Sequence, residues 1–170
     1  MAISKKVEEI LNKQINAEFW SAYFYLSMSN YCNANGMPGV ANWMKVQFQE
    51  ETSHAMKILD YVNERSGRVV LEPITEVPSD WNGILHIFEE TLKHEEIVTG
   101  LINGCVNVAI EEKDHASVNF LQWFVDEQVE EEATVNEILD QLRMFEGKGH
   151  GLYMMDKEFK ARVFVDSTQA

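Results

Sequence analysis

Four long stretches of this chain repeat apolar residues at steps of three and four, and each stretch interrupts its apolar stripe with one glutamate near the middle. Such steps place side chains on one face of an α-helix, so each stretch predicts a helix with a single buried face. The interrupting residues are Glu18, Glu51, Glu95 and Glu131. A buried carboxylate without a partner costs several kcal/mol, and no Lys or Arg occurs on these stripes. Metal cations held between the helices are therefore the natural countercharge.

Turn and capping residues divide the chain into helices. They predict long helices over about 5–33, 38–66, 82–112 and 114–145, and a short fifth helix over about 152–164. Ser4 and Asp114 are expected N-caps, while Gly67 ends the second helix. Gly147, Gly149 and Gly151 separate the fourth helix from the fifth. We expect the whole chain, 1–170, to form one all-α domain.

The connection between the second and third helices is long, and its length predicts the topology. Residues 68–81 reach roughly 46 Å if extended, and a helix of about 28 residues is roughly 42 Å long. The connection can therefore cross the bundle from end to end, which makes the second and third helices parallel. A four-helix bundle with one long crossover belongs to the ferritin-like class. Residues 69–71 in the crossover are expected to form a short strand.

Composition limits the function classes. A net charge of −14 argues against nucleic-acid binding through a basic surface and is compatible with attracting cations. No apolar run approaches the roughly 18 residues that span a membrane, and the N-terminus lacks the apolar core of a signal peptide. Cys32 and Cys105 are expected to be free buried thiols. Together these features indicate a cytoplasmic protein without a membrane partner.

The glutamates belong to pairs with the spacing of metal ligands. Glu51 and His54 are three residues apart, as are Gln128 and Glu131, so each pair projects from one side of its helix. Glu18 and Glu95 add one carboxylate each from the other two helices. This set matches the di-iron pattern of helical bundles, with Gln-x-x-Glu in place of a second Glu-x-x-His. Four carboxylates carry −4, which two divalent cations would balance. Oxygen ligands with one imidazole suit iron or manganese, and zinc is able to compete.

Several motifs in this chain resemble those of the bacterial non-haem ferritins, over about 4–159. They are the segments 16–20, 49–54, 119–124, 127–132, 151–153 and 156–158. The resemblance implies two ferroxidase irons, one at Glu18, Glu51 and His54 with Glu51 bridging, and one at Glu95 and Glu131 with Gln128 nearby. It also implies a third iron site, formed by Glu50, Glu127, Glu130 and Glu131.

The resemblance extends to residues around the pair. Tyr25 lies two helical turns after Glu18 and corresponds to a family tyrosine that can take part in electron transfer, although a core tyrosine bonded to a carboxylate is the alternative. Trp123 corresponds to a family tryptophan near the site, where packing is the expected role. His94, next to Glu95, is expected to point off the core face toward solvent.

The resulting hypothesis is an iron-storage ferritin with ferroxidase activity. Its partners would be Fe(II) and dioxygen or hydrogen peroxide, its cofactor would be iron without haem, and the resemblance implies a shell of 24 identical subunits around a ferric oxyhydroxide mineral. Three alternatives remain open: a non-storage di-metal oxidase or peroxidase, a bacterioferritin-like protein, and a metal-free structural bundle. Thr52 stands where a bacterioferritin places its haem-binding methionine, which argues against haem.

Overall fold

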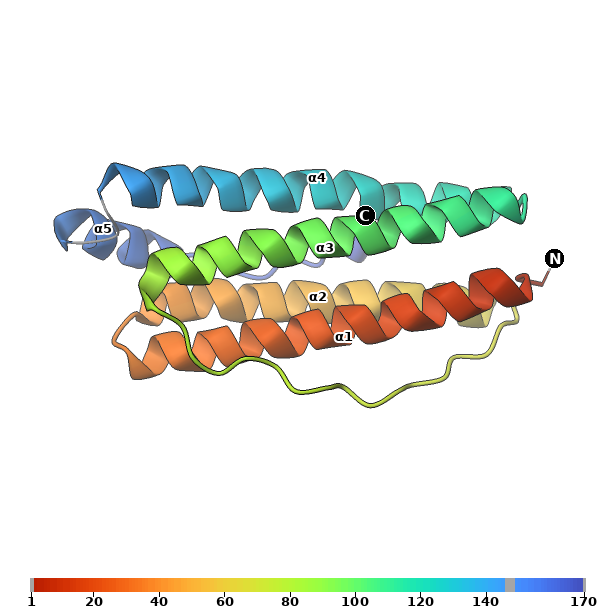
Figure 1. Cartoon of the computed structure of the whole chain (residues 1–170), viewed down its shortest axis with the longest axis horizontal. Helices are drawn as coiled ribbons and strands as arrows, with labels where there is room; N and C mark the ends of the chain where they lie inside the picture. The colour runs from red at the N-terminus through yellow and green to blue at the C-terminus, as the bar shows by residue number, and fades with distance from the viewer. Residues whose placement is uncertain (1, 146–148, 170) are drawn as a thin grey trace.

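The computed structural model describes residues 2–145 and 149–169, and its helices follow the predicted order. The four long helices are α1 (Lys5–Ala34), α2 (Pro38–Glu64), α3 (Gly83–Glu111) and α4 (His115–Met144). A shorter helix, α5 (Gly149–Phe159), and a 3-10 turn, η1 (Ser167–Gln169), follow. No strand occurs in the described ranges. The all-α bundle with one long crossover is confirmed, and α2 and α3 run parallel while the crossover passes along α1 (Figure 1).

Local interactions define the helix ends close to where the sequence places them. The Ser4 side chain accepts a hydrogen bond from the Val7 amide, and Asp114 accepts one from the Ser117 amide, so both expected N-caps are confirmed. Asn82 occupies the N-cap position of α3, but its side chain makes no capping hydrogen bond. The expected helix break at Gly147 lies outside the described residues.

The predicted strand at residues 69–71 is wrong. Side chains of α1 take up the backbone groups of the crossover that a strand would have paired. Asn12 donates to the Arg68 carbonyl at 2.9 Å and accepts from the Val70 amide at 2.7 Å. Further along, Asn16 donates to the Glu72 carbonyl. A single extended segment satisfied in this way needs no neighbouring strand.

The fifth helix begins earlier and ends earlier than predicted. After Phe159 the chain makes a turn and continues in extended form along α2 until η1. The Asn42 side chain of α2 donates to the carbonyls of Phe159 and Arg162, at 2.9 Å each. These contacts hold the chain in an extended path where a longer helix was expected, because they engage carbonyls at the point where α5 stops.

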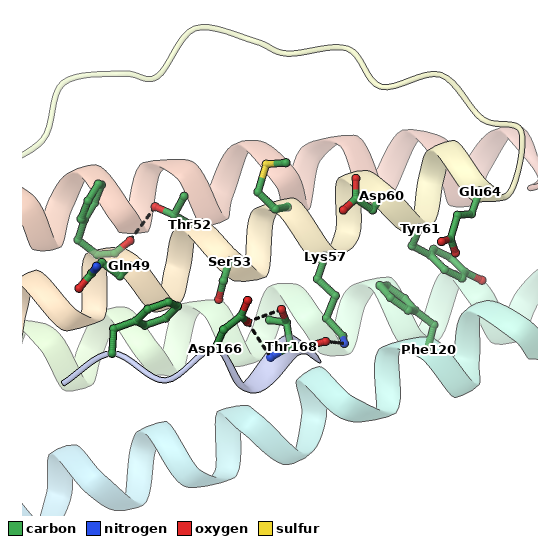
Figure 2. A pocket seen from close by; sticks show the side chains of 13 residues that line it. Gln49, Thr52, Ser53, Lys57, Asp60, Tyr61, Glu64, Phe120, Asp166 and Thr168 are labelled. Carbon is green, nitrogen blue, oxygen red and sulfur yellow. Dashed lines mark hydrogen bonds between the residues drawn. The ribbon is translucent and has the colours of Figure 1, made fainter. Parts of the chain in front are cut away.

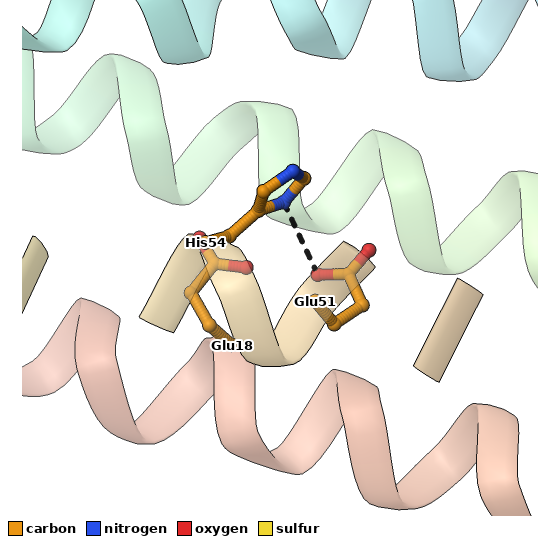
Figure 3. A group of neighbouring side chains, drawn as sticks. All are labelled: Glu18, Glu51 and His54. Carbon is orange, nitrogen blue, oxygen red and sulfur yellow. Dashed lines mark ion pairs between the residues drawn. The ribbon is translucent and has the colours of Figure 1, made fainter. Parts of the chain in front are cut away.

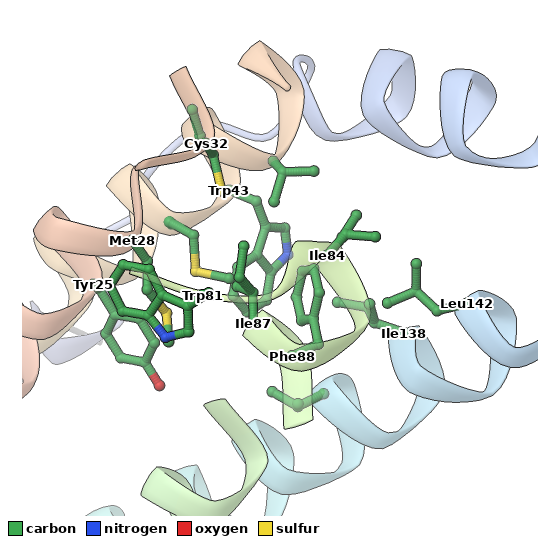
Figure 4. Close-up of a cluster of buried hydrophobic side chains, with 14 of the residues drawn as sticks. Tyr25, Met28, Cys32, Trp43, Trp81, Ile84, Ile87, Phe88, Ile138 and Leu142 are labelled. Carbon is green, nitrogen blue, oxygen red and sulfur yellow. The ribbon is translucent and has the colours of Figure 1, made fainter. Parts of the chain in front are cut away.

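The apolar core consists of two clusters separated by a polar layer. One cluster contains Phe24, Tyr25, Trp43, Phe88 and Leu139, and part of it is shown in Figure 4. The other cluster contains residues nearer the opposite end of each helix, among them Leu11, Ile58, Ile102, Leu121 and Phe124. On every long helix the interrupting glutamate lies between the residues of one cluster and those of the other. The fold therefore brings the four acids to the middle of the bundle.

Candidate metal centre

The structure brings three predicted ligands from α1 and α2 into one tight group. Glu18 comes from α1, and Glu51 and His54 come from α2 (Figure 3). One ligand atom of each lies within 4.8 Å of the others, and His54 Nδ1 is 3.7 Å from Glu51 Oε2. All three residues are at most 2 % exposed. This spacing allows one ion to contact all three residues.

Each member of this group keeps one buried polar atom without a hydrogen-bond partner. These atoms are Glu18 Oε2, Glu51 Oε2 and His54 Nε2. The other oxygen of Glu18 accepts a hydrogen bond from the Gln14 amide at 2.8 Å. Buried polar groups in folded proteins nearly always have a partner, and two unsatisfied carboxylate oxygens in a bundle core are costly. A cation bound between Glu18, Glu51 and His54 Nδ1 would supply the missing partner to both oxygens, while His54 Nε2 lies on the Glu127 side.

The α3 and α4 residues complete the polar layer but are held in a different way. Glu95 accepts hydrogen bonds from the Tyr25 hydroxyl and from Gln128 Nε2, the latter at 3.1 Å. Glu131 Oε2 accepts one from Gln47 Nε2 at 3.0 Å. Both glutamates are buried, but neither joins the tight ligand group. Within the described residues, therefore, one half of the predicted pair of metal positions is assembled, and the other half has its oxygens engaged by neutral donors.

Burial and mutual repulsion change the protonation of the four acids. Burial raises the pKa of Glu18, and burial together with the Glu95 carboxylate raises that of Glu51 well above its usual range. For the same main reason the pKa of Glu95 rises to about 7 and that of Glu131 to about 8. Glu95 and Glu131 therefore retain protons near neutral pH in the absence of cations, and a bound dication would displace them.

Burial has the opposite effect on His54, because its charged form is the cation. Its pKa falls to about 4, so the imidazole is neutral at pH 7. A neutral imidazole has one nitrogen lone pair available, which is the form that binds metals. Trp123 packs edge-on against this ring, with centroids 5.4 Å apart, consistent with the packing role expected for it.

The residues predicted for a third iron site lie on the more exposed side of the centre. Glu127 Oε1 is 3.8 Å from His54 Nε2, and burial, followed by the charges of Glu130 and Glu50, raises the pKa of Glu127. Glu50 and Glu127 are half-buried and Glu130 is exposed. Glu50 already has a cationic partner, because Arg162 donates to its Oε2 at 2.7 Å.

Sequence reasoning missed two of these partners. Gln47 lies one helical turn before Glu51, so its position on the buried face could have been found from the spacing. Arg162 comes from beyond α5, and nothing in its spacing indicates that it reaches α2.

The prediction for His94 is wrong. This residue lies between α1 and α3 rather than facing solvent, with its ring among Trp20, Phe24 and Tyr25. Its Nε2 is 2.7 Å from the Ser21 hydroxyl. Burial lowers its pKa to about 4, so it is a neutral core histidine. The α1–α3 contact is wide enough to cover the position beside Glu95 that the stripe pattern assigns to solvent.

The comparisons with known proteins agree on one family. The family model described as a ferritin-like domain matches residues 8–145. A bacterial non-heme ferritin of Bacteroides fragilis is 41% identical over 160 residues, covering 94% of this chain and 99% of the relative. Another from Campylobacter jejuni is 38% identical over 158 residues, covering 93% of this chain and 95% of the relative.

Solved structures give the same result. A closed form of the Archaeoglobus fulgidus ferritin, made by site-directed mutagenesis, matches with a TM-score of 0.95 and 49% identity, covering 96% of this chain and 100% of the other. An open pore ferritin from the same archaeon matches with a TM-score of 0.93 and 50% identity, covering 95% and 98%. No helix in the described ranges has both the length and the apolar character needed to cross a membrane. On this sequence and structural similarity, the chain belongs to the ferritin family.

Proposed function

We propose that this protein stores iron and oxidises it at the centre between the four long helices. The observation that carries the proposal is the buried group of Glu18, Glu51 and His54, in which one ligand atom of each residue lies within 4.8 Å of the others. Two carboxylates and one imidazole form a donor set that suits Fe(II). Iron is the substrate of this centre, because it would bind as Fe(II) and leave as Fe(III).

A second Fe(II) would bind on the α3–α4 side, through Glu95 and Glu131. Glu51, whose protonation responds to Glu95, Glu18 and Glu131, lies among the other acids and would bridge the two ions. Two dications would balance the four negative charges, and their binding would release the protons that the buried acids retain. Gln128 would remain a hydrogen-bond donor to Glu95 rather than a ligand, because its amide nitrogen already faces that carboxylate.

The oxidation needs two electrons, and two adjacent Fe(II) ions supply one each. Dioxygen would take both electrons with two protons and leave as hydrogen peroxide, whereas hydrogen peroxide would take both with two protons and leave as two waters. The task of the protein is to hold both ions within reach of one oxidant molecule while leaving coordination positions open. Carboxylates suit this task because they can change their mode of coordination as the ions become Fe(III).

Tyr25 is placed to assist this chemistry. Its hydroxyl donates a hydrogen bond to Glu95, and burial with the surrounding carboxylates raises its pKa well above the usual range. The phenol is therefore protonated in the metal-free protein. We expect it to orient Glu95 and to provide an additional electron when the two irons alone do not complete the reduction.

Storage requires an enclosed space that one chain cannot provide. The solved relatives include an open pore ferritin and an engineered closed form. We infer that this chain likewise assembles with copies of itself into a shell, with oxidised iron accumulating inside as ferric oxyhydroxide. A non-storage oxidase would use the same ligands, so the mass of the assembly and the iron retained per chain separate the two functions.

Replacing a ligand of the tight group should slow oxidation. Even partners outside the first ligand shell typically contribute about 10–100-fold to metal affinity or activity, so Glu18→Gln or His54→Ala should slow the initial phase by at least about tenfold. The measurement is stopped-flow absorbance after mixing metal-free protein with two Fe(II) per chain in air. Size-exclusion chromatography should show an unchanged assembly.

Matched controls of the same residue type are available at exposed positions. Glu9 on α1 and His115 on α4 are exposed, so Glu9→Gln and His115→Ala should leave the initial phase unchanged. If Glu18→Gln and His54→Ala oxidise iron as fast as the parent protein does, the proposed centre is not where oxidation occurs.

A further inference from the structure

The chain beyond α5 returns to the candidate metal centre. We call residues 160–168 the C-terminal segment. Asn42 holds its beginning through the Arg162 carbonyl, and Lys57 holds its end by donating to the Thr168 carbonyl at 2.8 Å. Figure 2 shows the second anchor beside the groove that the segment borders. Val163 and Val165 are 73 % and 70 % exposed, whereas the half-buried Phe164 lines the groove together with Phe48, so polar anchors and one apolar side chain keep the segment in place.

Arg162 is the residue of this segment that reaches the acids. Its Nη2 donates to Glu50 Oε2 at 2.7 Å and to Gln47 Oε1 at 2.6 Å, while Nη1 donates to the Trp43 carbonyl at 3.2 Å. The guanidinium also lies over the Trp43 ring, 4.5 Å from its centroid. Four contacts to α2 fix a cation beside Glu50.

The charge of Arg162 also acts on Glu131. Gln47, which accepts from Arg162, donates from its amide to Glu131. The guanidinium therefore touches one carboxylate of the predicted third iron position and is linked through one amide to another. It also lowers the pKa of both Glu50 and Glu131 against the effect of burial.

A second cation, Lys57, acts on another of the more exposed acids. Lys57 lies over the Trp123 ring at 4.7 Å, and Trp123 packs on His54. Its charge lowers the pKa of Glu127. Lys57 is bonded to the end of the C-terminal segment, and Arg162 lies near its beginning. The C-terminal segment therefore contributes one cation, Arg162, to Glu50 and is bonded to a second, Lys57, whose charge acts on Glu127.

We propose that Arg162 is a tethered cation that competes with a third metal ion for Glu50, so that the position of the C-terminal segment sets the occupancy of the third site. The inference rests on the proposed function, because it assumes that the centre binds dications. A dication at Glu50 and Glu127 would be repelled by a guanidinium on the same carboxylate, and it could use the Glu50 oxygen fully only after Arg162 had moved away. Arg162 acts here as a positioning residue, since it touches a metal ligand and not the metal.

The test is calorimetric titration of the whole, metal-free protein with Zn²⁺ alone. The parent protein should show two tight equivalents per chain and a weak third. Arg162→Gln removes the charge while keeping a polar side chain, and it should tighten the third equivalent by about tenfold or more, given the strength of a charge–charge contact near a protein surface. Adding Glu50→Gln to this variant should abolish the gain.

Lys160→Gln is the matched control. Lys160 also belongs to the C-terminal segment, but its ion pair is with Asp156 of α5, 3.7 Å away, so this variant should bind the third Zn²⁺ as the parent does. An unchanged third equivalent in Arg162→Gln, with the two tight equivalents intact, overturns the inference and leaves the proposed function standing. If the parent protein itself binds no Zn²⁺ in two tight equivalents, the proposed function is overturned instead.

A measurement on the parent protein keeps the proposal testable even if Arg162→Gln folds poorly. As the third Zn²⁺ binds, amide hydrogen exchange in residues 162–168 should become faster, because Arg162 and its neighbours leave α2. Exchange that stays constant through the third equivalent contradicts the proposal.

Discussion

At the scale of single residues, the centre is defined by acids that the fold buries at a cost. Glu18, Glu51, Glu95 and Glu131 are at most 7 % exposed, and the pKa of each is raised chiefly by burial. A protein selected for stability alone would place apolar residues there. Their retention in the core fits a site that must exchange protons for cations, and it makes the metal-free protein sensitive to pH.

The raised pKa of Glu131 predicts the direction of that sensitivity. The unfolded chain loses this proton near pH 4.5, whereas the folded protein keeps it until about pH 8. The folded state therefore binds more protons between these values, and stability falls as pH rises through the window. Glu131→Gln, which cannot ionise, should match the parent at pH 5 and exceed it at pH 9 by an amount of the order of a few kcal/mol.

Thermal unfolding in the presence of a chelator at pH 5 and pH 9 measures this difference. Glu137→Gln is the control, because Glu137 lies on the exposed face of the same helix. A gain in melting temperature for Glu131→Gln that is equal at both pH values would show that removal of the ionisable group is not its cause.

At the scale of elements, the crossover shows how an extended segment can be held without a sheet. Asn12 uses both ends of its side chain amide on the crossover, and Ser27 and Tyr31 of α1 donate to carbonyls further along, those of Pro78 and Trp81. α1 therefore provides a row of hydrogen-bonding side chains that satisfies the backbone of the connection.

Removing the first of these anchors should loosen the start of the crossover. Asn12→Ala deletes the acceptor of the Val70 amide and should lower the free energy of unfolding by about 1 kcal/mol. Amide exchange at Val70 should become faster by about tenfold, while the helices keep their protection. Lys13→Ala, on an exposed neighbouring position, should change neither. Val70 exchange that is unaffected by Asn12→Ala would mean that water already satisfies this amide.

Much of this fold and half of the centre follow from spacing alone. Steps of three and four give the helices, and the acid at the middle of each stripe gives the layer where the stripes meet. Spacing fails to predict the structure where contacts between distant segments determine it. At the crossover, α1 side chains take the place of a paired strand. At His94, the contact between α1 and α3 is wider than one helical stripe. Arg162 could not be predicted, because its role depends on where an extended segment returns after α5.

At the scale of the whole molecule, the polar layer divides one apolar interior into two clusters. The layer replaces apolar packing at the middle of the bundle with polar side chains. Without a cation, some of their buried atoms lack a hydrogen-bond partner. A ligand that binds only the folded protein stabilises it in proportion to the logarithm of its concentration over its dissociation constant. Metal binding should therefore restore stability that the layer removes.

Saturation with Zn²⁺ should raise the melting temperature. Each of two sites, filled at about 100 times its dissociation constant, contributes about 2.7 kcal/mol, and in a chain of this size 1 kcal/mol shifts melting by about 2–4 °C. We expect an increase of about 10 °C or more by scanning calorimetry. Glu18→Gln combined with Glu51→Gln should lose most of the shift. A shift of equal size in that double variant would place the stabilising metal elsewhere on the protein.

The ligands are divided between two helical hairpins that are joined only through the crossover. The α1–α2 hairpin carries Glu18, Glu51 and His54, and the α3–α4 hairpin carries Glu95 and Glu131. An ion coordinated by residues of both hairpins would therefore cross-link them, and the only covalent connection between them is the extended crossover. Bound iron would add a connection between the hairpins beside the two apolar clusters that they share, and each departing ion would remove that connection.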